Sequence, residues 1–153
     1  MIDTATEFGA RVARRLRQEG IVWLTTVRDD LTPQPSPVWF LWDGETFLIY
    51  SQPNAQKLRN IARSPKVALH LNGDAGGNDI VIVSGEARIV ADAPLAEEVP
   101  AFVAKYLDIP AVPTAEDFAR TMQGYSVAIR VPPRRSAGSE PYDSKRGIIC
   151  PGP

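Results

Sequence analysis

The sequence predicts a mainly β fold with small helices (α+β), arranged as a six-stranded antiparallel barrel. Three observations lead to this fold class. Six segments are rich in β-branched and aromatic residues, the first three are joined by polar turns typical of hairpins, and helical periodicity is confined to short amphipathic stretches. With 153 residues, 44% of them hydrophobic, the chain is long enough to bury the core of one domain.

The first element is expected to be an amphipathic helix over residues 4–19. Thr4 and Glu7 have the spacing of a capping box, and Gly20 can end the helix. The arginines of this helix are interpreted as its charged outer face; they are Arg11, Arg14, Arg15 and Arg17.

The later elements alternate between strands and short helices. Strands are expected at 21–27, 34–42, 46–51, 67–71, 80–90 and 125–131, with an Asp43-Gly44 turn after the second and an interruption at Gly85 in the fifth. Helices are expected over about 52–64, 92–107 and 114–122, the second broken or kinked at Pro100 and the third capped by Thr114. Residues 1–131 then form one domain, and 132–153 are expected to be a flexible tail.

The composition excludes several classes of function. The formal net charge of −1 gives no overall attraction to nucleic acid, and the apolar runs are too short to span a membrane. Cytoplasmic residence is therefore expected. The chain has 1 cysteine and 1 histidine, so neither a Cys- or His-based metal site nor an intramolecular disulfide is predicted.

A proline-rich strand is the strongest local signal. In Pro33-Gln34-Pro35-Ser36-Pro37, prolines occupy every second position, and backbone N–H groups alternate sides along a strand. One edge of the strand therefore lacks donors and is expected to be unpaired. A flat heteroaromatic ring could lie against that edge beside Trp39, near the N–H groups that follow Pro37. An edge strand that uses proline only to prevent aggregation is the alternative.

A basic segment lies after the third strand. Residues 51–66 contain no acid and four basic residues, which are Lys57, Arg59, Arg63 and Lys66. A hydroxyl at Ser51, a helix start near Pro53 and a lysine early in that helix are the components of an anion site, and phosphate is the expected anion. A solvated basic helix face is the alternative.

Together these features resemble the split β-barrel proteins of the pyridoxamine 5'-phosphate oxidase-like (PPOX) class. The resemblance rests on the order of the proline-rich strand, the Asp-Gly hairpin, the strand ending at Ser51-Gln52 and the helix after it. The segments 58–69 and 83–88 look particularly similar to the family. The resemblance covers residues 8–131 and implies an FMN-binding-like split barrel. The arginine-rich helix and Ala104-Lys105-Tyr106 are most similar to the actinobacterial branch that uses the deazaflavin coenzyme F420.

The resemblance implies an F420-dependent oxidoreductase that transfers a hydride between the reduced coenzyme and an electron-poor small organic substrate such as an enone or quinone. It also implies a homodimer with cofactor sites at the subunit interface. By residue matching, the cofactor-binding positions are Pro37, Val38 and Trp39 at the ring, Ser51, Gln52, Lys57 and Asn60 at the phosphate, and Arg59 at the acidic tail of the coenzyme. No catalytic side chain is assigned, although Tyr125 could supply a proton.

Two alternatives remain open from the sequence. One is an FMN-binding flavin reductase or oxidase of the same fold. The other is a protein that binds and carries the coenzyme without catalysis. The chain lacks the longer C-terminal substrate-binding segment of the pyridoxamine oxidases proper, and vitamin B6 oxidation is therefore not expected.

Overall fold

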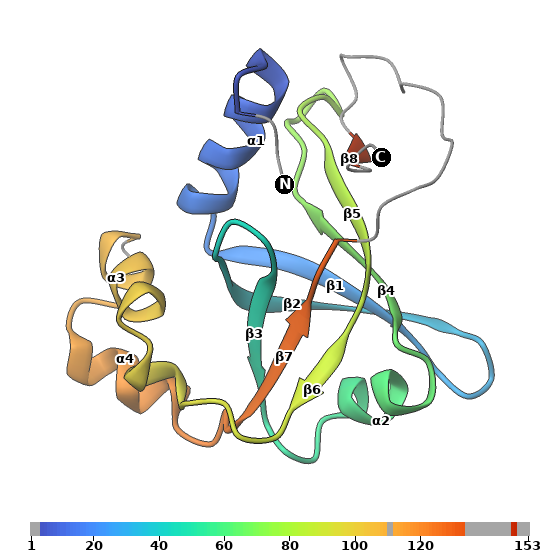
Figure 1. Ribbon diagram of the computed structural model, residues 1–153, viewed down its shortest axis with the longest axis vertical. Coiled ribbons are helices and arrows are strands. Elements are labelled where there is room, and N and C mark those ends of the chain that lie inside the picture. The colour runs from blue at the N-terminus through green and yellow to red at the C-terminus, as the bar shows by residue number, and fades with distance from the viewer. Residues whose placement is uncertain (1–3, 110–111, 134–147, 150–153) are drawn as a thin grey trace.

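The strands form one sheet that curls into a nearly closed barrel. The computed structural model describes residues 4–109, 112–133 and 148–149. Within them, neighbouring strands follow the order β6-β7-β3-β2-β1-β4-β5-β8, and only β5 and β8 pair in parallel. The strands are β1 (Ile21–Val27), β2 (Pro33–Trp42), β3 (Phe47–Ser51), β4 (Lys66–Leu71), β5 (Val81–Glu86), β6 (Arg88–Val90), β7 (Val127–Val131) and β8 (Ile148–Ile149), as Figure 1 shows.

The predicted fold class is confirmed, although the number of strands differs. The described residues contain eight strands and not six. The expected fifth strand divides into β5 and β6, and the short strand β8 lies within the segment expected to be a flexible tail. The rest of that tail, from residue 134 onward, lies outside the described residues, as does Cys150.

The barrel closes where the chain passes from β5 to β6. β5 pairs with β4, whereas β6 pairs with β7 at the other end of the sheet. The interruption falls at Ala87 and not at Gly85, which belongs to β5. Glycine at position 85 lets the chain at Val131 and Pro132 approach β5 closely. A Cβ there would lie 2.6 Å from Cγ1 of Val131 and 2.7 Å from the carbonyl oxygen of Pro132. A bridge between Gly85 and Pro133 joins the two ends of the sheet at this point.

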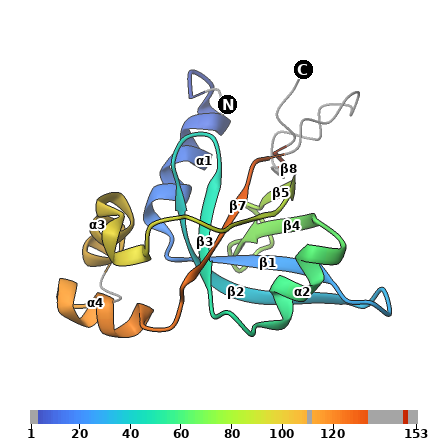
Figure 2. The same cartoon turned by 60° about the horizontal axis from the view of Figure 1, so that its bottom comes forward.

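The helices lie outside the barrel wall. They are α1 (Glu7–Gln18), α2 (Gln56–Arg63), the 3-10 helix η1 (Ala96–Glu98), α3 (Pro100–Asp108) and α4 (Ala115–Met122). Figure 2 shows α3 and α4 together on one side of the barrel and α2 on another, near β1 and β2. Because η1, α3 and α4 are consecutive and contact one another, they form a single helical layer.

Local capping explains where the helices begin. α1 starts later than expected, because Thr6 and not Thr4 is its N-cap and accepts a hydrogen bond from the Gly9 N–H at 3.0 Å. Pro100 starts α3, as the missing N–H of proline favours, so the expected break is confirmed. Thr114 caps α4 as predicted, through the Asp117 N–H at 3.1 Å.

Two apolar clusters share strand β3. The first fills the barrel and includes the buried side chains of α1, Val12 and Leu16. The second lies between the outer face of the barrel and the η1–α3–α4 layer, around Phe102, Tyr106 and Phe118. All five residues of β3 are buried, and its apolar side chains alternate between the two clusters, with Phe47 and Ile49 in the first and Leu48 and Tyr50 in the second.

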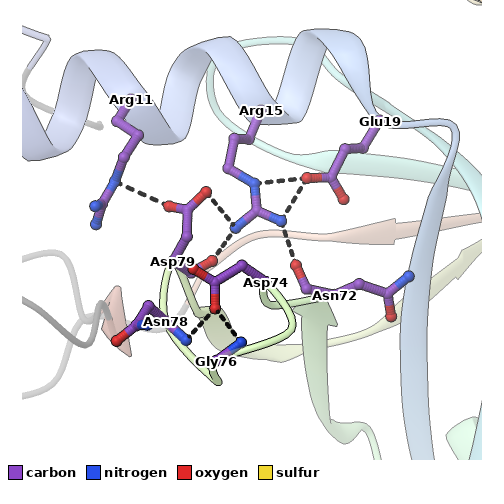
Figure 3. A network of polar contacts seen from close by, with 8 residues as sticks. All are labelled: Arg11, Arg15, Glu19, Asn72, Asp74, Gly76, Asn78 and Asp79. Carbon is purple, nitrogen blue, oxygen red and sulfur yellow. Dashed lines mark hydrogen bonds and ion pairs between the residues drawn. The ribbon is translucent and has the colours of Figure 1, made fainter.

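The interpretation of the α1 arginines as an outer face is wrong for Arg15 and Arg11. Arg15 is buried and donates hydrogen bonds to Glu19 and to the backbone carbonyls of Asn72 and Asp79. The Arg11 Nε lies 3.1 Å from an Asp79 carboxylate oxygen. Figure 3 shows that these side chains join α1 to the loop between β4 and β5. The alternation of charged and apolar residues along the helix could not reveal this loop, which packs against the helix from a distant part of the sequence.

Candidate functional site

The proline-rich part of β2 has one unpaired edge, as the sequence predicted. From Pro33 to Trp39 the strand pairs with β1, and its pairing with β3 involves only Phe40–Trp42. Among the described residues, no strand covers the other edge of Pro33–Trp39. Because backbone N–H groups alternate sides along a strand, the backbone N–H of Trp39 faces this open edge, as do the backbone nitrogens of the prolines. The edge therefore offers one donor next to an exposed proline.

A cavity of about 290 Å³ lies beside this edge. It brings together all three predicted ring-binding positions, Pro37, Val38 and Trp39, with the predicted phosphate-binding Lys57. The other lining residues are Ile21, Tyr50, Thr121, Met122 and Tyr125. Its size is at the lower end of the range typical of ligand pockets. The cavity thus joins the open strand edge to the start of α2.

Lys57 provides the positive charge in this cavity. It lies in the first turn of α2, whose N-cap, Ala55, has no side chain that could accept from the free N–H groups of that turn. Burial lowers the pKa of Lys57, and no ion pair within the described residues involves it. A half-buried ammonium beside a helix N-terminus is a favourable place for an anion.

Other predicted cofactor-binding residues do not line the cavity. Ser51 is buried at the end of β3, and its hydroxyl lies 3.3 Å from the Gln52 carbonyl oxygen, to which it donates. Gln52 is exposed in the turn before α2. Arg59 is also exposed, and its guanidinium donates to the Gln56 side chain and to the Asn54 carbonyl. Gln52 and Arg59 therefore lie on the solvent side of the start of α2, whereas Ser51 is buried beneath it.

Asn60 belongs to α2 and is fully buried on the side of the helix that faces β1 and β2. Its side-chain nitrogen donates to Thr26 Oγ1 at 2.9 Å and to Gln34 Oε1 at 3.0 Å, while its oxygen accepts from Gln56 Nε2 at 2.9 Å. These bonds tie α2 to β1 and β2. Asn60 therefore fixes the helix that carries Lys57, and its own polar atoms are already engaged.

Sequence reasoning missed four of the residues that line the cavity, namely Ile21, Tyr50, Thr121 and Met122. Tyr50 directly precedes Ser51, so its position next to the anion site was a usable signal. The two residues of α4 are distant in sequence, and only Met122 belongs to the buried face that the helical periodicity indicates. Tyr125 follows Gly124, whose φ of 86° turns the chain from α4 back towards the barrel.

The comparison with protein families agrees with this geometry. The family model of pyridoxamine 5'-phosphate oxidase matches residues 8–135. The chain belongs to the pyridoxamine 5'-phosphate oxidase family. This is a family of oxidoreductase-type split barrels that bind flavin-type cofactors. The match begins in α1 and includes every residue that lines the cavity.

Solved structures have a similar fold, and one of those described here is more than 30% identical to this chain. One described as an F420 reductase is 32% identical, with 81% of this chain and 92% of that chain covered and a TM-score of 0.59. A putative pyridoxamine 5'-phosphate oxidase from Listeria innocua is 21% identical, with 82% and 93% covered and a TM-score of 0.60. A conserved hypothetical protein from Mycobacterium tuberculosis is 24% identical, with 85% and 81% covered and a TM-score of 0.66. No curated protein matches the chain.

Two further findings bear on possible ligands. Among the described residues, no helix is long and apolar enough to cross a membrane. The same residues contain no group of three or more His, Cys, Asp or Glu side chains placed to hold a metal ion.

Proposed function

We propose that this chain is an oxidoreductase that transfers a hydride between reduced coenzyme F420 and an electron-poor small organic substrate such as an enone or quinone. The observation that carries the proposal is the cavity that joins the open edge of β2 to the Lys57 ammonium. The 32% identity to a protein described as an F420 reductase favours the deazaflavin over FMN.

The residues present fit a flat ring with an attached phosphate. Pro37, Val38 and Trp39 line the cavity, and the Trp39 backbone N–H at the open edge would donate to a ring oxygen or nitrogen. Lys57 and the N–H groups of the first turn of α2 would bind the phosphate. With about 290 Å³ the cavity accommodates a ring system, while the remaining length of a coenzyme would extend into solvent.

The exposed residues near α2 have a different proposed role. Gln52 and Arg59 would contact the coenzyme outside the cavity, Arg59 at its acidic tail, where an exposed guanidinium is accessible. Ser51 would bind the phosphate after exchanging its weak bond to the Gln52 carbonyl. Asn60 would support the site from behind by holding α2 in place.

The chain itself contributes binding and orientation to the reaction. The bound coenzyme would supply the hydride. The protein would hold the ring against β2 and leave its other face towards the wall formed by Thr121, Met122 and Tyr125. The Tyr50 hydroxyl donates to the Pro94 carbonyl at 2.8 Å, and burial raises its pKa, so Tyr50 is a poor proton donor for a substrate.

A binding titration tests the cofactor assignment. The purified protein is titrated with coenzyme F420, FMN and FAD, with fluorescence as the readout. We expect the tightest binding for F420, and we expect Lys57→Ala to weaken it by roughly 1.5–3 kcal/mol through loss of a charge-assisted contact. Lys66→Ala is the matched control, because Lys66 is an exposed lysine on β4 outside the cavity.

The titration separates the alternatives. Tighter binding of FMN than of F420 would favour the flavin reductase or oxidase. Equal F420 affinity of Lys57→Ala and the unaltered protein would remove Lys57 from the phosphate site. Oxidation of reduced F420 is then followed with a panel of enones and quinones, because tight binding without turnover of any member would indicate a coenzyme carrier.

We also propose that the protein is a homodimer with the cavity at the subunit interface. Ile21 and Tyr125 line the cavity and are each 36% exposed, so apolar surface surrounds its opening. A second subunit would cover this surface and help to exclude water from the ring. Light scattering should give twice the mass of the 16.7 kDa chain, and replacement of both residues by Ser should shift the protein towards monomer. A monomeric mass for the unaltered protein over the whole concentration range would contradict this arrangement.

A further inference from the structure

The Tyr106 hydroxyl lies between β1 and β2 at the point where the two strands separate. Their register ends with Ile21 opposite Trp39, so Gly20 and Phe40 would form the next pair. Tyr106 Oη takes the place of that direct contact, because it accepts from the Phe40 N–H at 2.7 Å and donates to the Gly20 carbonyl at 2.8 Å. From Phe40 onward, β2 pairs with β3. One hydroxyl thus satisfies the backbone where β2 changes its partner.

The ring of Tyr106 contacts the wall of the cavity. Its centroid lies 4.1 Å from that of Trp39, and the two rings are nearly parallel at 11°. Phe118 of α4 lies on the Trp39 indole as well, at 6.1 Å, whereas Phe102 packs on Tyr106 at 5.2 Å. Trp39 lines the cavity, and its N–H faces the open strand edge.

We propose that Tyr106 is a positioning residue that holds Trp39, through both its hydroxyl and its ring, in the orientation that shapes the ligand cavity. Phe40 is fully buried, so its N–H would have no partner without the hydroxyl unless β2 moved. Such a movement would displace Trp39, the preceding residue, and the stacked ring would no longer match it. The ligand-binding part of the inference rests on the proposed function, but the orientation of Trp39 does not.

The attachment of α3 does not depend on this hydroxyl. Lys105, the residue before Tyr106, donates to the Leu16 carbonyl at 3.0 Å, and its ammonium lies 3.4 Å from the centroid of the Phe40 ring. Tyr106 is fully buried and surrounded by the aromatic rings of the second cluster. The substitution Tyr106→Phe therefore removes the backbone bridge and leaves the helix in place.

The experiment uses the full chain with Trp39 as its single tryptophan, obtained by Trp23→Phe and Trp42→Phe. In this background, Tyr106→Phe is compared with Val83→Ala, a loss of buried side chain on β5 that leaves the cavity unchanged. Acrylamide quenching and anisotropy decay report on Trp39 without any ligand. We expect Tyr106→Phe to increase quenching and local motion of Trp39, and Val83→Ala to leave both unchanged.

Ligand binding is the second measurement. If Trp39 adopts the binding orientation only part of the time, the apparent affinity falls by that fraction. We expect the dissociation constant for coenzyme F420 to rise about tenfold in Tyr106→Phe and to stay constant in Val83→Ala. Equal quenching, anisotropy and affinity in both variants would show that the Tyr106 hydroxyl does not position Trp39 and would overturn the proposal.

Amide exchange keeps the inference testable if the variant does not fold. In the unaltered protein, the Phe40 amide should exchange as slowly as the amides of the β1–β2 ladder, because the Tyr106 hydroxyl accepts its hydrogen. Fast exchange at Phe40 would overturn the proposal. Failure of the unaltered protein to bind F420 and FMN would instead refute the proposed function, while the tryptophan measurements would still decide the role of Tyr106.

Discussion

Lys105 places a titratable group inside the protein. The residue is 8% exposed, and its ammonium lies between the end of α1 and the Phe40 ring. Burial lowers the pKa of Lys105 to about 7, and the opposing effect of the Glu19 charge is smaller. The folded protein therefore loses this proton at a much lower pH than the unfolded chain does.

The free energy of unfolding should rise with pH above about 7. Between this value and the ordinary lysine pKa of 10.5, the unfolded chain binds a proton that the folded protein has released, so a higher pH favours folding. Below pH 7 the lysine is charged in both states, and the cost of burying it is largest. We expect a rise on the order of a few kcal/mol in urea unfolding between about pH 6 and about pH 9.

Lys105→Met is the matched variant for this prediction. Methionine keeps the aliphatic length of the side chain without a titratable group, so its unfolding free energy should depend less on pH over the same range. Parallel pH profiles of the two proteins would contradict the assignment. Above about pH 10, Tyr106 should lower the free energy of unfolding as the pH rises. Burial raises the pKa of Tyr106, so the unfolded chain releases this proton at a lower pH than the folded protein does.

Single residues also show what the sequence could predict about the site. The alternation of Pro33, Pro35 and Pro37 predicted the open edge, because the missing N–H is a property of the residue itself. The amide of Asn60 has no such intrinsic signal. Whether it faces a ligand or Thr26 depends on which strands pack against α2, and this is decided by tertiary structure.

At the level of elements, α1 is attached to the barrel by charge as well as by apolar packing. Arg15 joins the helix to the β4–β5 loop through two carbonyls, and its Nη1 lies 3.4 Å from a carboxylate oxygen of Asp79. Asp74 orders the same loop by accepting from the N–H groups of Gly76 and Asn78 at 2.9 and 2.7 Å. The helix and the loop therefore stabilise each other, as Figure 3 shows.

Arg15→Ala should destabilise the protein by about 2–3 kcal/mol, because it leaves the Asn72 and Asp79 carbonyls without their donor and removes one of the two arginines that pair with the Asp79 carboxylate. Arg14→Ala is the matched control on the same helix. Arg14 is exposed, so its loss should change the unfolding free energy by less than about 0.5 kcal/mol. Urea unfolding at neutral pH measures both, and equal effects of the two substitutions would show that the buried network contributes nothing.

Elements were predicted well where their ends have local signals. Thr114 and Pro100 fixed the starts of α4 and α3, because capping and the missing proline N–H act within one turn. The division of the fifth strand at Ala87 was misplaced by two residues. Gly85 is required by its approach to Val131, and a contact with a strand so distant in sequence leaves no local pattern.

For the whole molecule, the order of the strands explains why the site forms where it does. β2 pairs with β1 along its first part and with β3 along its last part. It therefore links two halves of the barrel, one formed with β1, β4 and β5 and the other with β3, β7 and β6. The change of partner leaves an unpaired edge between the halves. The layer of α3 and α4 covers part of this gap, and the cavity is the part that remains open.

The late position of β7 has a consequence for synthesis of the protein. β3 lies between β2 and β7 in the sheet, but β7 comes near the end of the barrel sequence. Ser51 of β3, for example, can pair with Val127 only after β7 has been synthesised. A nascent chain on the ribosome would expose the apolar strand β3 until residue 131 has emerged. Such long-range pairing slows folding and leaves a strand edge open to other chains. The period before β7 is translated is therefore when the edge of β3 is most exposed to pairing with other chains.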